Sequence, residues 1–201
     1  MENQETELKL LLNQQGYETL LNSWAHEGPM RKQENTFFDS DAKQLRQILW
    51  ALRLRLDGER WWLTAKGPNQ QTQGISEREE IEVELSTNEA KRILKSPFCL
   101  SEISASPTSL LREMVGDISV KPWMQFSNMR QVLLWKDFRL ELDRTYCRGE
   151  ERYELEFEAD KELLQKVRAE LENSLKVLGV CFRESETGKL LWAISVDSNY
   201  D

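Results

Sequence analysis

Two glutamates and a lysine alternate with uncharged residues in Glu5-Thr6-Glu7-Leu8-Lys9, near the amino terminus. This alternation is typical of a β-strand, in which successive side chains point to opposite faces, so the three charges share one face. Carboxylates two residues apart on a strand lie roughly 7 Å apart, close enough to share a hard cation or one substrate. A solvated strand face with an internal ion pair is the simpler interpretation of this stretch alone. Its chemistry therefore depends on whether other strands repeat the pattern.

Charged residues alternate with apolar ones in most of the later strands that the sequence predicts. They are Arg53 and Arg55, then Lys66, Glu80 and Glu82, Arg130, then Arg139, Glu141 and Asp143, and finally Glu154, Glu156 and Glu158. A half-buried strand with one wet face would explain any single row. Here the alternating positions are almost all charged and their signs are grouped by strand. This favours a closed sheet with its apolar face outward beneath helices and its charges lining a water-filled interior.

The two signs of charge indicate two kinds of ligand. Carboxylates bind hard divalent cations such as Mg²⁺ or Mn²⁺ through oxygen. Arginine and lysine bind phosphate oxygens, and arginine can do so with two parallel hydrogen bonds. A polyphosphate chain with bridging metal ions would satisfy both sets.

Composition narrows the classes of protein and of mechanism. A chain of 201 residues suits a single domain over residues 1–201, and a net charge of −8 argues against general affinity for nucleic acid or membranes. No apolar run approaches ~18 residues and no cationic leader opens the chain, so we expect a soluble, cytoplasmic protein. The three cysteines are widely spaced and predict neither a disulfide framework nor a zinc site. His26 is the only histidine, which argues strongly against a histidine base or a catalytic triad.

Periodicity predicts an α+β domain on a closed or nearly closed antiparallel sheet of nine or ten strands. The most distinct local feature is a hairpin of strands 50–56 and 61–66 around Asp57-Gly58. Further strands are expected at 34–38, 79–85, 119–126, 129–135, 138–145, 153–158 and 189–196, and a glutamine-rich loop at 69–76. Helices are expected at 14–25, 45–48, 87–95, 110–114 and 160–178.

An ordered set of motifs resembles the CYTH superfamily, the triphosphate tunnel metalloenzymes, over nearly the whole chain. That superfamily includes inorganic triphosphatases, thiamine triphosphatases and class IV adenylate cyclases. The motifs are Glu5 to Lys9, Thr36-Phe37-Phe38-Asp39, Ala51 to Arg55 with Leu63 to Pro68, Arg78 to Glu82, Arg130, Leu140 to Asp143, Tyr153 to Glu156, and Gly188-Lys189-Leu190.

The resemblance implies a closed eight-stranded antiparallel tunnel with helices packed outside, and roles for its charged residues. Catalytic roles would fall to Glu7, Lys9 and Glu156. The phosphate ligands would be Lys9, Arg53, Arg55, Lys66, Arg130 and Lys189. The ligands of Mg²⁺ or Mn²⁺ would be Glu5, Glu7, Asp143, Glu154 and Glu156, with Glu80, Glu82 and Glu141 as further members. All three late glutamates share a face, so Glu154/Glu156 and Glu156/Glu158 both remain open as the inward pair.

The function implied is metal-dependent hydrolysis of a triphosphate, either inorganic tripolyphosphate or a small organic one such as thiamine triphosphate. The expected partner is that small molecule, and the protein would be a monomer or homodimer. One alternative is cyclisation of ATP, although the lead-in Arg148 to Tyr153 is closer to the triphosphatase branch than to the glycine-rich cyclase one. The other is a polyphosphate- or nucleotide-binding module without catalysis. The identity of the triphosphate stays open because basic ligands recognise phosphate and not its substituent.

Overall fold

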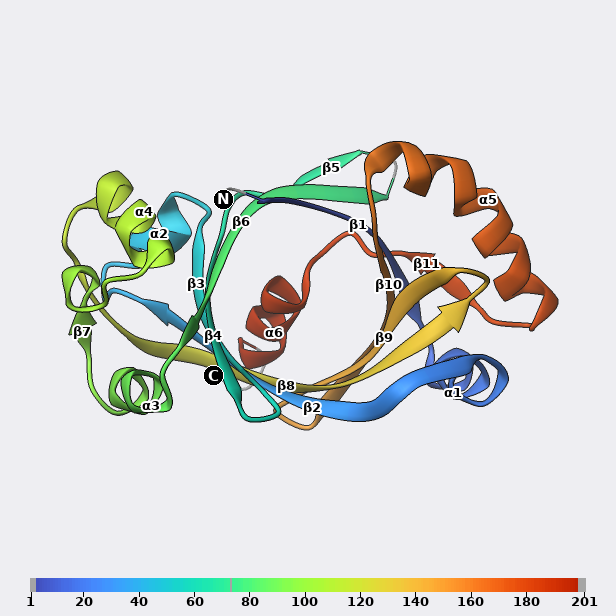
Figure 1. Cartoon of the computed structure of the whole chain (residues 1–201), viewed down its shortest axis with the longest axis horizontal. Coiled ribbons are helices and arrows are strands. Elements are labelled where there is room, and N and C mark those ends of the chain that lie inside the picture. The colour runs from blue at the N-terminus through green and yellow to red at the C-terminus, as the bar shows by residue number, and fades with distance from the viewer. Residues whose placement is uncertain (1–2, 73, 199–201) are drawn as a thin grey trace. The chain divides into compact units, whose positions relative to one another are not determined.

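The computed structural model describes residues 3–72 and 74–198. Its main strands are β1 (Asn3–Leu12), β2 (Ala25–Asp39), β3 (Ala51–Asp57), β4 (Arg60–Lys66), β6 (Ile75–Leu85), β8 (Ser119–Trp135), β9 (Phe138–Cys147) and β10 (Glu150–Glu158). Short strands are β5 (Gln70–Thr72), β7 (Phe98–Cys99) and β11 (Phe182–Glu184). The helices are α1 (Gln14–Ser23), α2 (Gln44–Gln47), α3 (Thr87–Lys95), the 3₁₀ turn η1 (Leu100–Glu102), α4 (Ser106–Val115), α5 (Lys161–Val177) and α6 (Lys189–Asp197) (Figure 1).

The sheet is a closed eight-stranded antiparallel barrel, as predicted. Its hydrogen-bonded order is β1-β10-β9-β8-β2-β3-β4-β6, and a further pairing of β6 with β1 closes the path. β11 and β5 extend from β1 and β6, and β7 pairs with β8. The β3–β4 hairpin has a two-residue connection between Asp57 and Arg60, and Gly58 takes the positive φ of 64° that such turns require.

Contacts within the chain define two compact units. The first unit comprises residues 1–4, 33–69 and 78–126, and the second comprises 5–32, 70–77 and 127–201. The long strands β2, β6 and β8 contribute residues to both.

The apolar core of the second unit lies between its strands and two helices. Leu8 and Leu10 of β1 and Leu155 of β10 alternate with charged residues, and all three are at most 1% exposed. They pack against α5, whose Leu164 and Leu171 recur at helical spacing on one face. Because strand side chains alternate, the charged residues between these leucines lie on the opposite face of the sheet.

The first unit has a core of the same kind. Leu52, Leu54 and Leu63 of β3 and β4 are buried against Ile93 of α3 and Leu111 of α4. The apolar positions alternate with Arg53 and its neighbours, so the charged faces of β3 and β4 are also directed away from the helices.

Asp39, from the Thr36-to-Asp39 motif, has a structural role at the start of α2. Its buried carboxylate accepts hydrogen bonds from the backbone N–H groups of Ser40 and Leu45 and from the guanidinium of Arg46. The Arg46 guanidinium in turn lies 3.8 Å from the ring centroid of Trp123. This aspartate therefore fixes α2 to the end of β2.

Three predictions about elements were wrong. Residues 189–196 are helical, as α6, because the buried side chains Ala193 and Val196 recur three residues apart and the apolar run Leu190 to Ala193 does not alternate. The expected loop at 69–76 instead contains β5 and the start of β6. The strands expected at 119–126 and 129–135 are one continuous strand, β8. No helix among the described residues is long and apolar enough to cross a membrane.

Candidate functional site: a buried charged cluster

Strand register assembles most of the predicted site within the second unit. Lys9 of β1 is opposite Glu156 of β10, which is opposite Glu141 of β9. In the adjacent row, Glu154 of β10 is opposite Asp143 of β9. The pairing of neighbouring strands thus places carboxylates that are far apart in sequence side by side.

Three cations connect these carboxylates. The Lys9 ammonium lies 2.9 Å from a carboxylate oxygen of Glu7 and 2.9 Å from one of Glu156. Arg130 of β8 is opposite Asp143 of β9. Its guanidinium donates two hydrogen bonds of 2.8 and 2.6 Å to Asp143 and one of 3.0 Å to Glu156. It also forms an ion pair with Glu141. Glu156 is therefore shared between β1 and β8.

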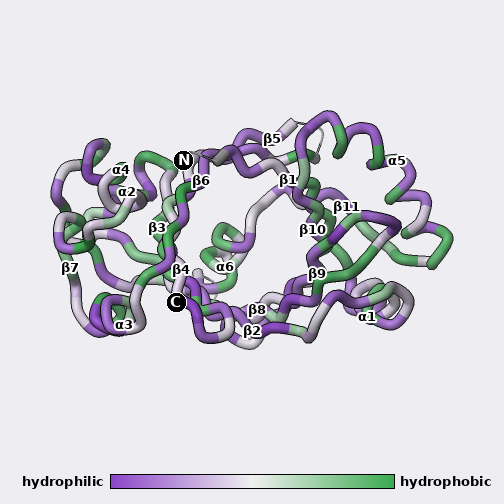
Figure 2. Tube along the Cα trace, in the orientation of Figure 1, coloured by the Kyte–Doolittle hydropathy of each residue, from purple (hydrophilic) through white to green (hydrophobic). Residues whose placement is uncertain are grey.

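Lys189, the first residue of α6, supplies the third cation. Its ammonium lies 2.8 Å from Asp143 and 3.4 Å from Glu154, and it also contacts Glu156. The sequence interpretation had assigned this lysine to a final strand. The structure instead places it at the beginning of α6, whose following residues are mainly apolar (Figure 2).

Most members of the cluster are removed from solvent, although Glu141 and Lys189 are partly exposed. Asp143 and Glu154 are fully buried, and Lys9, Arg130 and Glu156 are each less than 9% exposed. Burying ions without partners is very unfavourable, so the cluster depends on its mutual pairing.

Mutual pairing keeps these groups charged despite burial. Burial alone would raise the pKa of Glu156, but Lys189, Lys9 and Arg130 outweigh it and hold the pKa well below its usual range. Burial likewise opposes the charge of Lys9, yet Glu156 and Glu7 raise its pKa. Glu141 differs, because burial dominates over Arg130 and raises the pKa of its carboxyl. Arg130 and Lys189 also lower the pKa of the buried Asp143 carboxyl, so Asp143 and Glu156 are both held ionised.

The remaining carboxylates complete an acidic set in the second unit. Glu5 is half-buried on β1, two residues before Glu7. Of the two pairs left open by the sequence, Glu154 and Glu156 are buried, whereas Glu158 is exposed. The face carries six predicted metal ligands: Glu5, Glu7, Glu141, Asp143, Glu154 and Glu156.

The other predicted phosphate ligands lie in the first unit. Arg53 is 5% exposed and donates to Thr64 at 3.1 Å and to Glu82 at 3.4 Å. Its Nε atom is buried with no hydrogen-bond partner among the described residues. Lys66 pairs with Glu80 at 2.5 Å, and Arg55 donates to the Asn35 side chain at 3.1 Å.

The donor set suits a hard divalent cation chemically. All six acidic ligands offer oxygen, the donor atom that hard divalent cations prefer. The Oε2 atom of Glu154 is buried and accepts no hydrogen bond from the described residues, and the Lys189 ammonium lies 3.4 Å from it. In the described part of the chain, no three acidic, histidine or cysteine side chains are arranged to hold a metal ion, because ammonium and guanidinium groups lie between the carboxylates.

Arg152 is a member of this charged face that the sequence interpretation missed. It is 8% exposed and donates to Glu154 at 3.0 Å. It stands two residues before Glu154 on the same strand, so the alternation that identified Glu154 and Glu156 also places Arg152 on their face.

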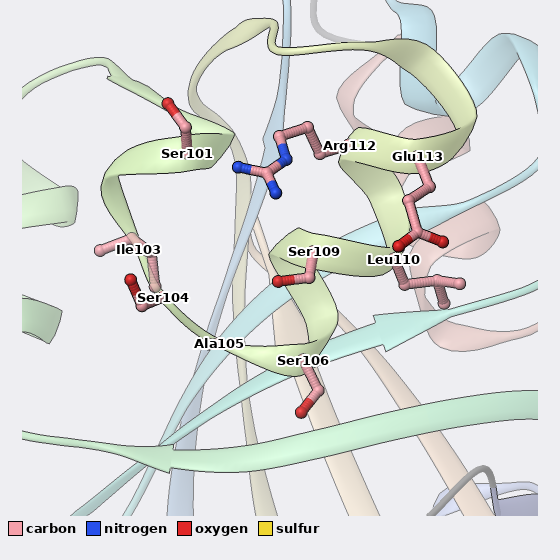
Figure 3. A pocket seen from close by; sticks show the side chains of 9 residues that line it. All are labelled: Ser101, Ile103, Ser104, Ala105, Ser106, Ser109, Leu110, Arg112 and Glu113. Carbon is pink, nitrogen blue, oxygen red and sulfur yellow. The ribbon is translucent and has the colours of Figure 1, made fainter.

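A separate hollow of about 580 Å³ lies in the first unit beside η1 and the start of α4 (Figure 3). Its lining includes Ser101, Ser106, Ser109 and Arg112. None of the predicted site residues lines it.

Comparison with known proteins places the chain in a family. The model of the CYTH domain matches residues 3–185. This chain belongs to the CYTH family. CYTH proteins are triphosphatases or cyclases that bind triphosphates and depend on divalent metals, so the family is an enzyme family. No curated protein matches the chain.

Solved structures agree with this CYTH assignment. HpAC1 from Hippeastrum, a proposed adenylyl cyclase with a dominant triphosphatase activity, is 25% identical with a TM-score of 0.88 over 95% of each chain. A proposed adenylate cyclase from Bacillus halodurans is also 25% identical, with a TM-score of 0.72 over 92% of this chain and 95% of that one. The PH1819 protein from Pyrococcus horikoshii shares the fold at 21% identity, with a TM-score of 0.59 over 94% and 98% of the two chains.

Proposed function

We propose that this CYTH protein hydrolyses a triphosphate with the help of a divalent metal, the substrate being inorganic tripolyphosphate or a small organic triphosphate. The observation that carries the proposal is the buried cluster in which Lys9, Arg130 and Lys189 all pair with Glu156. An ion network of this size is costly to bury for stability alone. A charged ligand that takes the place of some ion-pair partners would account for the presence of such a network.

The metal ligands proposed are the six carboxylates of the second unit, which would hold Mg²⁺ or Mn²⁺. When bound, such an ion neutralises charge on phosphate oxygens and lowers the pKa of a coordinated water. Lys9, Arg130 and Lys189 are now paired with five of these carboxylates: Glu7, Glu141, Asp143, Glu154 and Glu156. Metal binding by the carboxylates would release the three cations toward phosphate oxygens.

The phosphate ligands proposed are Lys9, Arg130 and Lys189 of the second unit and Arg53, Arg55 and Lys66 of the first. Arg53 supports this role because its buried Nε has no partner among the described residues, so a donor is available without breaking another bond. Arginine forks match the geometry of phosphate oxygens, and lysines act as point charges.

The hydrolytic step would use water as the nucleophile. Glu7 and Glu156 accept hydrogen bonds and orient the water for in-line attack on a terminal phosphorus. The new P–O bond forms as the bridging P–O bond breaks, and the proton of the water passes through a carboxylate to solvent. Lys9 and the arginines stabilise the negative charge on the departing phosphate or pyrophosphate.

Adenylate cyclisation is the second candidate, because both 25%-identical structures are of proposed adenylate cyclases, one of which has a dominant triphosphatase activity. An assay with tripolyphosphate, thiamine triphosphate and ATP, each with Mg²⁺ or Mn²⁺, separates the candidates by scoring phosphate and cyclic AMP. We expect phosphate release from tripolyphosphate or thiamine triphosphate and its loss with a chelator. Cyclic AMP from ATP as the main product would overturn the proposal in favour of a cyclase. Metal-dependent binding without turnover over hours would overturn it in favour of a binding module.

A further inference from the structure

Arg152 joins three parts of the second unit that are distant in sequence. From β10 its guanidinium donates 3.0 Å to Glu154 and 2.7 Å to the Ser185 hydroxyl, and it also donates to the Thr187 carbonyl. Its Cζ atom lies 5.9 Å from the ring centroid of Trp192 on α6. One buried side chain therefore contacts a carboxylate of the cluster, the segment before α6, and α6 itself.

The segment that Arg152 contacts is the one that delivers Lys189. Ser185 is 5% exposed, and its backbone N–H donates to the Lys9 carbonyl at 3.0 Å. Its hydroxyl also donates to the Thr187 carbonyl at 2.9 Å, which folds residues 185–187 into a compact turn. The helix begins two residues later with Lys189. Fixing this turn thus sets where the Lys189 ammonium lies.

We propose that Arg152 is a positioning residue that holds the 185–187 turn, and through it Lys189, against the carboxylate cluster. The inference rests on the proposed function, since it assigns Arg152 to the working arrangement of that site. Arginine suits the task because its planar fork can serve several acceptors at once, whereas lysine offers a single point charge. Arg152 does not contact substrate in this scheme and acts through Lys189.

The test is a double-mutant cycle of Arg152→Met and Lys189→Met, with Ser185→Ala as a milder probe that leaves no buried charge unpaired. Arg152→Lys tests whether charge alone suffices. Arg144→Met is the matched control, because Arg144 of β9 is an exposed arginine that pairs with Glu151, the residue before Arg152 on β10. Each variant is measured for kcat and KM with tripolyphosphate, and for amide exchange and acrylamide quenching in the region of Trp192.

We expect Arg152→Met to lower kcat by about tenfold and to add little in the Lys189→Met background, since both changes remove one arrangement. Amide exchange in residues 185–192 should accelerate in Arg152→Met and Ser185→Ala but not in Arg144→Met. Arg152→Lys should recover only part of kcat. Fully additive losses in the cycle, or unchanged exchange in residues 185–192, would overturn the inference.

The exchange measurement needs no turnover, so it separates the two proposals. If the wild-type protein hydrolyses no triphosphate, the proposed function fails. Accelerated exchange in the Arg152 and Ser185 variants would still support the role of Arg152 in holding the 185–187 turn. If Arg152→Met fails to fold, Ser185→Ala decides the question alone. That variant removes the hydrogen bond between Arg152 and the Ser185 hydroxyl and leaves Glu154 paired with Arg152.

Discussion

Lys9 and Glu156 are cross-strand partners on β1 and β10, and their charged atoms lie 2.9 Å apart in an environment that is almost closed to solvent. Glu7, on the same strand as Lys9, lies at the same 2.9 Å from its ammonium. The lysine therefore balances two carboxylates of the proposed metal site, so removing it affects both charge balance and chemistry.

Replacing Lys9 with methionine should reduce tripolyphosphate turnover by at least about 100-fold, because the developing phosphate charge loses a preorganised donor. The variant leaves Glu7 and Glu156 with less compensation, so its free energy of unfolding should fall as well. The double variant Lys9→Met with Glu156→Gln should regain part of that stability and stay inactive. The measurements are kcat and urea unfolding, with Arg139→Met as a control at an exposed ion pair. Near-normal turnover in Lys9→Met would contradict the assignment.

Replacing Lys189 with methionine should tighten Mn²⁺ binding while weakening substrate binding. Its ammonium lies 2.8 Å from Asp143 and 3.4 Å from Glu154, where it competes with an added cation. We expect calorimetry without substrate to show a dissociation constant lower by about tenfold, which corresponds to ~1.4 kcal/mol. Lys136→Met, which alters an exposed lysine paired with Glu170, is the control. Weaker Mn²⁺ binding in the Lys189 variant would argue that the lysine organises the carboxylates and does not compete with the ion.

Replacing Arg53 with lysine should raise KM for tripolyphosphate by about tenfold. Lysine keeps the positive charge but cannot form the two parallel hydrogen bonds that a guanidinium donates to a phosphate group. The stability of the fold should change little, since the ammonium can still face Glu80 and Glu82. Arg60→Lys provides the comparison at an exposed position beside Trp62. An unchanged KM for Arg53→Lys would remove this residue from the proposed phosphate ligands.

Replacing Asp39 should affect the stability of the fold and not the rate of the reaction. Its carboxylate accepts from the backbone of Ser40 and Leu45 and from Arg46, and it lies outside the charged cluster. Asp39→Ala should lower the free energy of unfolding by about 1–3 kcal/mol, because it leaves buried donors without an acceptor. The turnover per folded molecule should remain near that of the wild type under conditions where both are folded. A loss of kcat with unchanged urea unfolding would show instead that the motif acts in the reaction.

The sequence could predict most strands and their charged rows because both follow from a period of two, whereas the closed barrel of eight strands was implied by the resemblance to the CYTH superfamily. Alternation alone places Lys9 and Glu156 on the faces opposite their leucine neighbours, and pairing of adjacent strands then brings the two together. The contacts of Lys189 could not be predicted in the same way, since they depend on how α6 is placed after a turn that has no periodicity. Arg152 had the correct spacing, but an arginine between glutamates resembles a surface ion pair until its burial is known.

The environment of the cysteines yields a prediction that depends on pH. Cys147 is 3% exposed, and burial raises the pKa of its thiol, with Asp197 adding to the effect, whereas Cys181 is exposed. A raised pKa means less thiolate at a given pH, so at about pH 8 iodoacetamide should modify Cys181 far faster than Cys147.

The same shift affects stability in alkaline solution. Because the folded pKa of Cys147 exceeds the unfolded one, its contribution is complete below the ordinary value of 9.0 and is lost as the pH rises through the folded pKa. Cys147→Ala should therefore lose less stability than Cys181→Ala between about pH 9 and pH 11 in urea unfolding. Tyr153, whose pKa burial and Glu151 raise to about 12, is present in both variants and cancels from the comparison. Equal alkaline losses, or faster alkylation of Cys147, would show that this thiol is accessible in the native protein.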